Sequence, residues 1–482
     1  SDASVVNLGK ISASSSDVIL IARTVENHGT IEAPNGTAAL AAGSEVLVKA
    51  DGEERIFVEA GSAEGTSKAT QAGLIRAAEA EIKAAGGNEY ALAIKHTGVT
   101  RATGVSKRGG RIFLSAGGKS TVRHSGTIEA QKSDGNGGQV RVEAARIELA
   151  PISKIDVSAD PASLVGNGGE VLIGGGYQGQ DPSLGNAETV TAEEGSILLA
   201  DAAAEGDGGR VILWSDDTTR FAGTISARGG AVSGDGGFVE TSGSVLSLSG
   251  SARVTTSAAH GTFGAWLLDP ADMEIVSGDG GDLTGFAVDP GAIVAALDGS
   301  NIVLLADNSI TVSDVIDASG NVGAGHLTLD APTLHLNAAI LLRGGSVLSG
   351  TASTVNVGAS GRVQNGIDAA AAGGLVNLLG ANYGSTGSEL RIGKSLTMRG
   401  SVGGTVLDAQ GNHGVLRITG DTSATGVVVT LDRLTFTGGD ALFGGRGGGI
   451  YINGGGGRKT DVTIQDSTIS GNSADFGGGN LQ

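Results

Sequence analysis

The sequence contains no cysteine and few of the bulky residues that fill an ordinary globular core. Its 482 residues include 7 Pro, 9 Phe, 4 Tyr, 2 Trp and 2 Met. The absence of Cys excludes disulfides, thiolate metal ligands and a cysteine nucleophile. No stretch approaches the roughly 18 consecutive apolar residues that a membrane-spanning helix requires. The first ten residues show no signal peptide, so the sequence reads as a piece of a longer protein.

Positive charge is also scarce. The chain has 51 Asp and Glu against 32 Lys and Arg, which gives a formal net charge of −19. An acidic chain without a basic run repels phosphate backbones, so nucleic acid is not expected as a partner. Gly-rich phosphate-binding fingerprints are uninformative here, because they arise by chance in a chain this rich in glycine. We therefore expect no cofactor.

Glycine is the residue in excess, with 85 copies. That is roughly 18% of the chain, against about 7% in an average protein. Collagen would need Gly at every third position and abundant Pro, and neither is present. Disorder would need low hydrophobicity, whereas 39% of the residues are hydrophobic. A folded chain with many tight turns and a core of small aliphatic side chains remains.

Two short phrases recur along the chain. The first is a Gly-Gly doublet followed by alternating apolar residues, and its starts are 28, 31, 40 and 28 residues apart, at Gly109, Gly137, Gly168, Gly208 and Gly236. The second falls between these copies, as in SGTIEA (Ser125–Ala130), SKIDVSA (Ser153–Ala159) and AGTISA (Ala222–Ala227). Strict alternation is typical of strands. In the Gly208 copy, Val211 and Leu213 are expected on one face, with Ile212 and Trp214 on the other.

A period near 30 with short strands and Gly-rich corners predicts an all-β parallel solenoid, in which each turn buries its apolar face against its neighbours. Glycine supplies the corner conformations where a Cβ would clash. A β-sandwich or a propeller is the alternative, but hairpin signals such as Asn35-Gly36 do not recur at a period. If every residue belonged to turns of about 25 residues, the solenoid would be an elongated rod.

The organisation along the chain suggests three regions: 1–268 with the repeated phrases, 269–440 with divergent strand units, and 441–482 with glycine triplets at Gly447 and Gly477. Insertions are expected at about 64–86 and at 176–190, the second because it explains the 40-residue interval. Residues 66–86 are rich in Ala, Glu, Lys and Arg, so a short helix is predicted there, with two more strands as the alternative.

Several stretches of the first 275 residues resemble the filamentous-haemagglutinin-like family of two-partner secretion exoproteins. They are VVNLGKISA (Val5–Ala13), GNEYALAIKHTGVTRATG (Gly87–Gly104), GGEVLIGGGYQGQDPSLGNAETV (Gly168–Val190), GDGGRVILWSDDTTRFAGTISARGG (Gly206–Gly230), GDGGFVETSG (Gly234–Gly243) and WLLDPADMEI (Trp266–Ile275). The C-terminal end, with SGNSA followed by GGG, is similar to repeats of polymorphic-membrane-protein-type autotransporters.

The resemblance implies a right-handed parallel β-helix, export through an outer-membrane transporter, and a surface or adhesive role. It places the protein outside a Gram-negative-type bacterium, either secreted or at the cell surface. One departure concerns the secretion motif Asn-Pro-Asn-Gly of the family, to which Ala33-Pro34-Asn35-Gly36 is only remotely similar. This departure suggests that the portion recognised for export lies upstream of Ser1.

Five residues are candidate ligand contacts. Trp214 with Asp216 and Asp217 could line a sugar-binding groove, although adjacent strand residues face opposite sides and a plain outward corner explains the same pattern. Tyr177 and Asp181 belong to the second insertion, which we expect to be the best-placed contact surface.

Catalysis and metal binding have weaker support. The loops SDGNGG (Ser133–Gly138) and SGDGGD (Ser277–Asp282) offer oxygen ligands for Ca²⁺, but they are not in tandem and read as plain turns. Asp314, Asp317 and Asp330 are candidate acids, and nothing in the sequence aligns them. His326 and His335 read as surface ladder residues. We expect no enzyme and no metal site.

The sequence thus predicts a fragment of a long exported β-helical rod with a structural and adhesive role. Expected partners are an outer-membrane transporter during export and a glycan or protein receptor on host or bacterial cells. Two alternatives remain open: a carbohydrate-active enzyme or lectin that uses one lateral face, and a self-associating extracellular fibre subunit.

Overall fold

The computed structural model describes most of the chain, and its contacts divide the chain into two compact units. The described residues are 3–50, 52, 54–59, 66–87, 91–104, 109–278, 287–384, 388–423, 426–454 and 457–476. One unit comprises Ser1–Pro270 with Gly278–Val303, and the other comprises Ala271–Ser277 with Leu304–Gln482.

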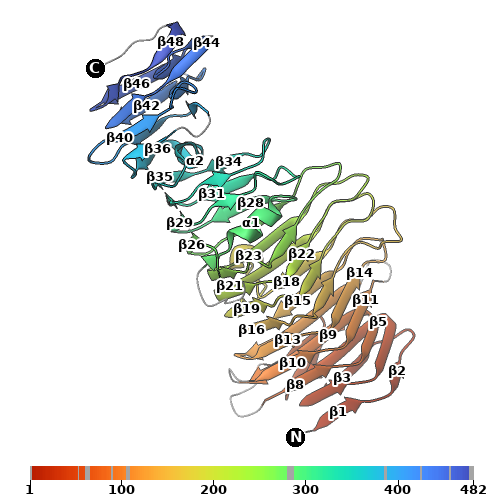
Figure 1. The fold of residues 1–482 in the computed structure, drawn as a ribbon. Coiled ribbons are helices and arrows are strands. Elements are labelled where there is room, and N and C mark those ends of the chain that lie inside the picture. The colour runs from red at the N-terminus through yellow and green to blue at the C-terminus, as the bar shows by residue number, and fades with distance from the viewer. Residues whose placement is uncertain are drawn as a thin grey trace. The chain divides into compact units, whose positions relative to one another are not determined.

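The first unit is a parallel β-helix with three faces, which confirms the predicted solenoid (Figure 1). Face A contains β1 (Ser4–Asn7), β4 (Thr24–Asn27), β8 (Lys68–Gln71), β10 (Leu92–His96), β13 (Thr121–His124), β16 (Arg146–Leu149), β19 (Thr189–Ala192) and β27 (Ala287–Val288). Face B contains β2 (Lys10–Ser12), β11 (Val99–Thr103), β14 (Thr127–Gln131), β17 (Lys154–Asp156), β20 (Ile197–Leu199), β22 (Thr224–Ser226) and β24 (Arg253–Thr255).

Face C contains β3 (Val18–Ala22), β12 (Arg111–Gly118), β15 (Gln139–Glu143), β18 (Glu170–Ile173) and β25 (Ala265–Leu268). Four longer strands bend from one face to the next. Strands β5 (Thr30–Ala42) and β9 (Leu74–Gly87) join faces B and C, whereas β21 (Arg210–Phe221) and β23 (Phe238–Leu248) join faces C and A. Each rung therefore pairs with the next in register around the whole coil.

Aliphatic columns fill the interior, as the alternation in the sequence predicts. On face B, Ile128 pairs with Ile155, Ile155 with Leu198, and Leu198 with Ile225. All four side chains are buried. Similar side chains stack one rung apart, so each turn covers the apolar side chains of the turn before it. Neighbouring turns therefore stabilise one another.

The helix predicted for 66–86 is wrong. This segment forms β8 and β9, so the alternative of two more strands is the one that the structure shows. Strand β9 pairs in register with β5 and β12 over face C, so this part of the chain belongs to the rungs. Ala80, Ile82 and Ala84 face the interior, and parallel pairing on both sides overrides the helix propensity of Ala, Glu and Lys.

The excursion near this point is an antiparallel hairpin of β6 (Val46–Val48) and β7 (Ile56–Val58). It lies on the outer side of face C, where Ile56 is buried against Ala39 and Ala41. The carboxylate of Glu81 accepts hydrogen bonds from the backbone N–H groups of Arg55 (2.8 Å) and Ile56 (3.0 Å). A fully buried carboxylate thus holds the hairpin on the sheet.

The second unit also has parallel pairing between successive turns. One column contains β26 (Asp272–Ile275), β29 (Ser309–Val312), β32 (Thr333–Leu336), β35 (Ala352–Val357), β36 (Ala370–Leu378), β39 (Leu396–Arg399), β42 (Val427–Asp432) and β46 (Thr460–Gln465). Shorter columns pair β30 (Ile316–Asp317) with β33 (Ile340–Leu341), β31 (Leu327–Asp330) with β34 (Leu348–Gly350), and β44 (Asp440–Arg446) with β48 (Ser473–Phe476). Two others contain β37 (Asn382–Tyr383), β40 (Thr405–Asp408), β43 (Leu434–Thr437) and β47 (Thr468–Ile469), and β38 (Leu390–Ile392), β41 (Leu416–Thr419) and β45 (Ile450–Asn453).

Two α-helices occur in the described residues, and the sequence analysis anticipated neither. Helix α1 (Pro290–Ala296) begins after Asp289, whose side chain accepts the Gly291 N–H, and it has Pro at its first position. Helix α2 is Val363–Ala369. Among the residues described, neither helix has the length and apolar character needed to cross a membrane.

Candidate functional site

A groove of about 940 Å³ lies along the corner between faces B and C of the first unit. Its floor is formed by glycines of the repeated doublets and by the single Gly264: they are Gly138, Gly168, Gly169, Gly208, Gly209, Gly236, Gly237 and Gly264. The other lining residues are mainly polar or aromatic and include Arg111, Lys132, Asp134, Gln139, Glu170, Arg210, Phe238, Phe263 and Asn301. The Gly-Gly phrase therefore marks the position of the groove as well as the start of a rung.

The floor leaves no room for side chains. A Cβ on Gly209 would lie 2.1 Å from the carbonyl oxygen of Gly169, and one on Gly237 would lie 2.1 Å from that of Gly209. The first glycine of each doublet is equally crowded, since a Cβ on Gly208 would lie 2.2 Å from the Ala227 oxygen. Both positions require glycine because backbones approach closely at this corner.

The backbone hydrogen bonds of the floor are already made. The second glycine of each doublet donates its N–H across the corner to the end of the preceding face B segment. The pairs are Gly138 to Ala130, Gly169 to Val157, Gly209 to Ala200 and Gly237 to Ala227, and the single Gly264 at the same position of the next rung donates to Thr256, with distances of 2.7 to 2.8 Å. Their carbonyl oxygens accept the N–H of the wall residue in the next rung, as in Arg210 to Gly169 at 2.9 Å. The two recurring sequence phrases thus meet at this corner.

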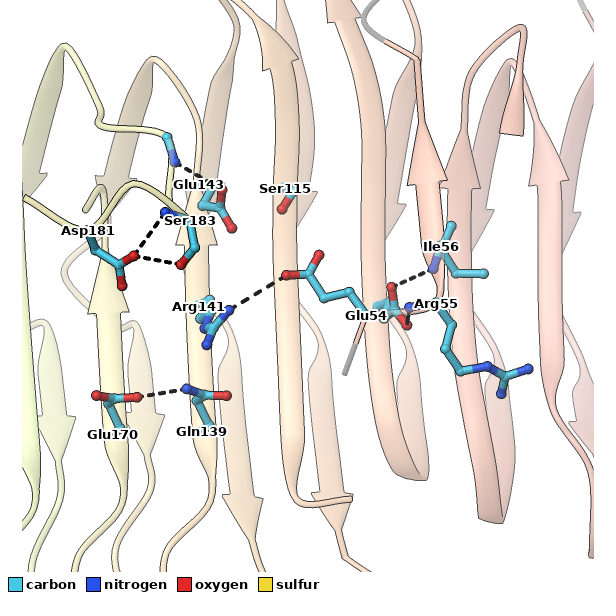
Figure 2. Close-up of polar contacts among 12 residues, drawn as sticks. Glu54, Arg55, Ile56, Ser115, Gln139, Arg141, Glu143, Glu170, Asp181 and Ser183 are labelled. Carbon is cyan, nitrogen blue, oxygen red and sulfur yellow. Dashed lines mark hydrogen bonds and ion pairs between the residues drawn. The ribbon is translucent and has the colours of Figure 1, made fainter. Parts of the chain in front are cut away.

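One wall of the groove is a ladder of outward side chains in register. Arg111, Gln139, Glu170, Arg210, Phe238 and Ala265 occupy the same position on successive strands of face C. The Gln139 amide donates to the Glu170 carboxylate at 2.7 Å, as Figure 2 shows, and Glu170 lies 3.9 Å from the Arg210 guanidinium. Polar groups with both signs of charge therefore line the wall at intervals of one rung.

An aromatic and cationic cluster marks one part of this wall. The rings of Tyr177 and Phe238 have centroids 5.8 Å apart, and the Arg210 guanidinium carbon lies 5.7 Å from the first and 5.8 Å from the second. Tyr177 is 44% exposed and Phe238 is half-buried. An aromatic ring with a planar cation beside it is a good contact for an amphipathic ligand.

The predicted insertion supplies Tyr177 and is anchored to face C. Its Gln178 backbone N–H donates to the Glu240 carboxylate at 3.1 Å, and its side-chain amide donates to Asp269 at 2.7 Å. Gln178 has a φ of 52°, an uncommon conformation for a residue other than glycine. Burial raises the pKa of Glu240 to about 7. Of the two carboxyl groups that hold Gln178, Glu240 therefore titrates near neutral pH.

Trp214 and Asp216 support the insertion. The indole N–H of Trp214 donates to Asp216 at 3.1 Å, and the side-chain amide of Asn186 donates to the same carboxylate at 2.8 Å. Gly179 lies directly on the indole, since a Cβ there would come within 2.4 Å of the ring. Trp214 and Asp216 therefore pack against the insertion. Their predicted role as ligand contacts stays a prediction.

Asp181 and Asp217 do not converge with that pair. The Asp181 carboxylate accepts the side-chain hydroxyl (2.6 Å) and the backbone N–H (2.9 Å) of Ser183, as Figure 2 shows, and the hydroxyl contact lowers its pKa. Asp217 is exposed at the bend of β21, where pairing with β23 shifts register between Ser215 and Thr218. Of the five predicted contacts, Tyr177 alone reaches the groove: it lies beside the lining residues, in contact with Phe238 and Arg210 of the wall.

The candidate acids of the second unit are hydrogen-bond acceptors: Asp317 caps its own turn, whereas Asp314 and Asp330 accept from residues distant in the sequence. Asp314 accepts the Ser277 N–H at 2.7 Å, which lowers its pKa, and Asp317 accepts the Ser319 hydroxyl at 2.6 Å, which lowers its pKa also. Asp330 accepts the Thr351 hydroxyl. A carboxyl group held ionised in this way is a poor proton donor at neutral pH.

In the described part of the two candidate calcium loops, the Asp134 carboxylate is also a hydrogen-bond acceptor within a turn. The Asp134 carboxylate accepts the Asn136 N–H at 3.1 Å, and this contact lowers its pKa. Of the loop Ser277–Asp282, residues 279–282 lie outside the described residues. Within the described residues, no group of three or more His, Asp or Glu side chains is arranged to hold a metal ion.

Sequence reasoning missed Arg210, Phe238 and Glu170 as groove residues. Each follows a Gly-Gly doublet directly, so the signal was the repeated position itself rather than any local motif. Stacking rungs in register brings these widely separated positions together, and a pattern read within one repeat does not reveal that convergence.

Comparison with known proteins gives one solved structure to report. The chain is similar to the HMW1 secretion domain from Haemophilus influenzae, with 30% sequence identity and a TM-score of 0.44. The match covers 55% of this chain and 66% of that chain, so this chain spans slightly less than two thirds of its length. No protein-family model matches the sequence, and no curated protein matches it.

Proposed function

We propose that this chain is part of a large exported bacterial surface protein of the two-partner secretion type, and that its coil is a structural and adhesive scaffold. The observation that carries the proposal is the position of the resembling stretches. Gly168–Val190, Gly206–Gly230 and Gly234–Gly243 form consecutive rungs of one parallel coil. The stretches that resemble the exoprotein family are thus the elements that build the coil and its insertion.

Three properties of this chain are compatible with export through a pore and with a role outside the cell. Each rung contacts only its neighbours, so a chain that emerges from a transporter pore can add rungs one after another. The absence of cysteine prevents oxidative trapping during passage. A net charge of −19 favours solubility outside the cell. The outer-membrane transporter is therefore the proposed partner in export, and a glycan or protein receptor is the proposed partner afterwards.

Binding rather than catalysis is the proposed activity. The acids Asp314, Asp317 and Asp330 are occupied as hydrogen-bond acceptors, whereas the groove offers polar side chains and aromatic rings. In this proposal the C-terminal residues 441–482 are autotransporter-like repeats.

Export is tested with the natural precursor that contains this chain. The precursor is expressed in a Gram-negative host with and without an outer-membrane transporter of the two-partner secretion type from the same source. We expect protease-accessible or released protein only when the transporter is present. Retention in the periplasm despite a functional transporter would contradict the proposed route.

Adhesion is tested separately with beads that carry the folded chain. We expect these beads to bind bacterial or epithelial cells more than beads that carry the heat-unfolded chain do. Equal binding by the two kinds of bead would contradict an adhesive role, whatever the export assay shows.

A further inference from the structure

The groove along the corner of faces B and C has a floor whose glycine N–H groups are already hydrogen-bonded. The second glycine of each doublet donates across the corner and the first donates to the next rung, and the carbonyl oxygens of the second glycines accept from the wall residues of the next rung. A peptide that adds a strand to a sheet needs unpaired backbone groups along an edge. Recognition in this groove therefore depends on the side chains of its walls.

The wall chemistry fits a polyhydroxylated ligand. Gln139, Glu170 and Arg210 present planar amide, carboxylate and guanidinium groups on successive rungs. Such groups donate or accept two parallel hydrogen bonds, which matches neighbouring hydroxyls on a sugar ring. Cationic and anionic residues both line the groove: Lys132 and Arg210 are accompanied by Asp134 and Glu170, and the third cation, Arg111, is paired with Glu79 at 3.2 Å. This balance favours an uncharged ligand over an anionic one.

The aromatic cluster supplies the complementary apolar contact. Tyr177 is exposed beside Phe238, and Phe263 lines the groove near them. The C–H-rich face of a sugar packs well on an aromatic ring, whereas its hydroxyls turn toward the polar wall.

The groove is long in the direction of the coil axis. Six wall positions, from Arg111 to Ala265, follow one another in register on successive rungs. Adjacent rungs are about 4.8 Å apart, so these positions extend over about 24 Å. That length accommodates several sugar residues in a row.

We infer that this groove binds a linear, uncharged oligosaccharide along the coil axis, with Tyr177 and Phe238 contacting sugar faces and Arg210, Glu170 and Gln139 contacting hydroxyls. The inference rests on the adhesive role proposed above and names the ligand class and the site. It concerns binding alone and includes no bond cleavage.

The test uses the purified chain and calorimetric titration with maltohexaose, cellohexaose and chitohexaose, together with a heparin-derived hexasaccharide and an extended alanine-rich decapeptide. We expect at least one uncharged hexasaccharide to bind. Arg210→Gln and Tyr177→Ala should each raise its Kd about tenfold, the size expected for loss of one aromatic or charge-assisted contact.

Matched controls exist elsewhere on the chain. Arg123→Gln removes an arginine that lies 3.2 Å from Glu148 on the neighbouring strand of face A. Tyr451→Ala removes a ring that lies 5.1 Å from the Arg417 guanidinium carbon in the second unit. Both controls should bind the sugar as the unchanged chain does. Circular dichroism and the thermal midpoint of each variant establish that it is folded, and Arg210→Lys provides a milder change at the same position.

Three results would overturn the inference. They are no binding of any uncharged hexasaccharide by the folded chain, binding of heparin or the decapeptide only, and sugar binding that Arg210→Gln and Tyr177→Ala leave unchanged. Each of these can occur while beads that carry the chain still bind cells, so loss of the groove assignment is distinguishable from loss of the adhesive role.

Discussion

The Nδ1 atoms of His96 and His124 lie 3.0 Å apart inside the coil, on neighbouring strands of face A. Both rings are fully buried. The His96 ring also contacts the Thr100 hydroxyl at 2.9 Å, and the His124 ring contacts the Lys154 carbonyl oxygen at 3.2 Å. The same column continues through a buried amide ladder, in which Asn27 donates to Gln71 at 2.7 Å. The interior thus holds neutral imidazoles in place of aliphatic side chains.

The histidine pair should make the fold sensitive to acid. Burial lowers the pKa of His124 to about 4 and that of His96 well below its usual value of 6.5. The unfolded chain binds these protons near pH 6.5 and the folded chain binds them only at much lower pH. The free energy of unfolding should therefore fall as pH decreases from about 6.5 toward 4, by on the order of 3 kcal/mol for His124.

Urea unfolding at pH 7.5 and pH 5 measures this effect. The double variant His96→Leu/His124→Leu should lose much of the difference between the two pH values, and the half-exposed His28→Gln should retain it. An unchanged pH difference in the double variant would show that other groups cause the acid sensitivity.

Glu240 should have the opposite pH dependence. Its folded pKa of about 7 lies above the ordinary value of 4.5, so the folded chain binds a proton over a range in which the unfolded chain does not. Its contribution to stability is largest below about pH 4.5 and is lost as pH rises toward 7, by on the order of 3 kcal/mol. Glu240→Gln should therefore raise the urea midpoint at pH 8 and leave it unchanged at pH 4.5.

The control for Glu240 is Glu129→Gln, which changes a partly exposed carboxylate paired with Arg101. This variant should behave like the unchanged chain at both pH values. If Glu240→Gln lowers stability at pH 8, the hydrogen bond from Gln178 depends on the ionised carboxylate, and the predicted sign is wrong.

The glycine floor predicts a large effect from a single methyl group. Gly209→Ala would place a Cβ 2.1 Å from the Gly169 carbonyl oxygen, so one rung must shift. We expect a loss of about 2–3 kcal/mol or more, typical of overpacking against backbone. Gly185→Ala is the matched control, because the nearest atom to its Cβ is 4.0 Å away. Similar thermal midpoints for the two variants would contradict the close packing.

The hairpin of β6 and β7 should depend on Glu81. In Glu81→Ala the N–H groups of Arg55 and Ile56 lose their acceptor, and the hairpin loses its attachment to face C. Limited proteolysis should then cleave within residues 46–58 at least tenfold faster, with the coil intact. Glu129→Ala, in the rungs away from the hairpin, should not change the cleavage rate. Equal rates in the two variants would show that the apolar contact of Ile56 suffices.

The coil could be predicted from the sequence because its period is visible in the residues themselves. Gly137, Gly168, Gly208 and Gly236 mark successive rungs, and the alternation after each doublet gives the buried face. The helix predicted for 66–86 was wrong because Ala, Glu and Lys favour helix in isolation, whereas β5 and β12 impose pairing on both sides of β9.

The candidate site was less predictable. Tyr177 could be identified because it lies in an insertion that lengthens one interval. Arg210 and Phe238 could not be identified from the sequence. Arg210 lies beside Phe238 because of the register between rungs, and beside Tyr177 because the insertion folds over face C. Trp214 and Asp216 looked like ligand residues because their polar and aromatic character is the same whether they contact a ligand or a neighbouring loop.

The β6–β7 hairpin and the insertion Gly176–Thr189 both leave face C without changing the pairing register of the strands around them. Ala42 and Ala84, which lie on either side of the hairpin in the sequence, are direct partners on adjacent strands. Arg210 aligns with Glu170 although Gly176–Thr189 intervenes between them. The coil therefore tolerates peptide of different length and sequence at these two points, since closing a longer surface loop costs little extra free energy. The sequences of the hairpin and of the insertion can therefore vary while the rungs of the coil stay constant. The same two points are suited to the grafting of foreign epitopes.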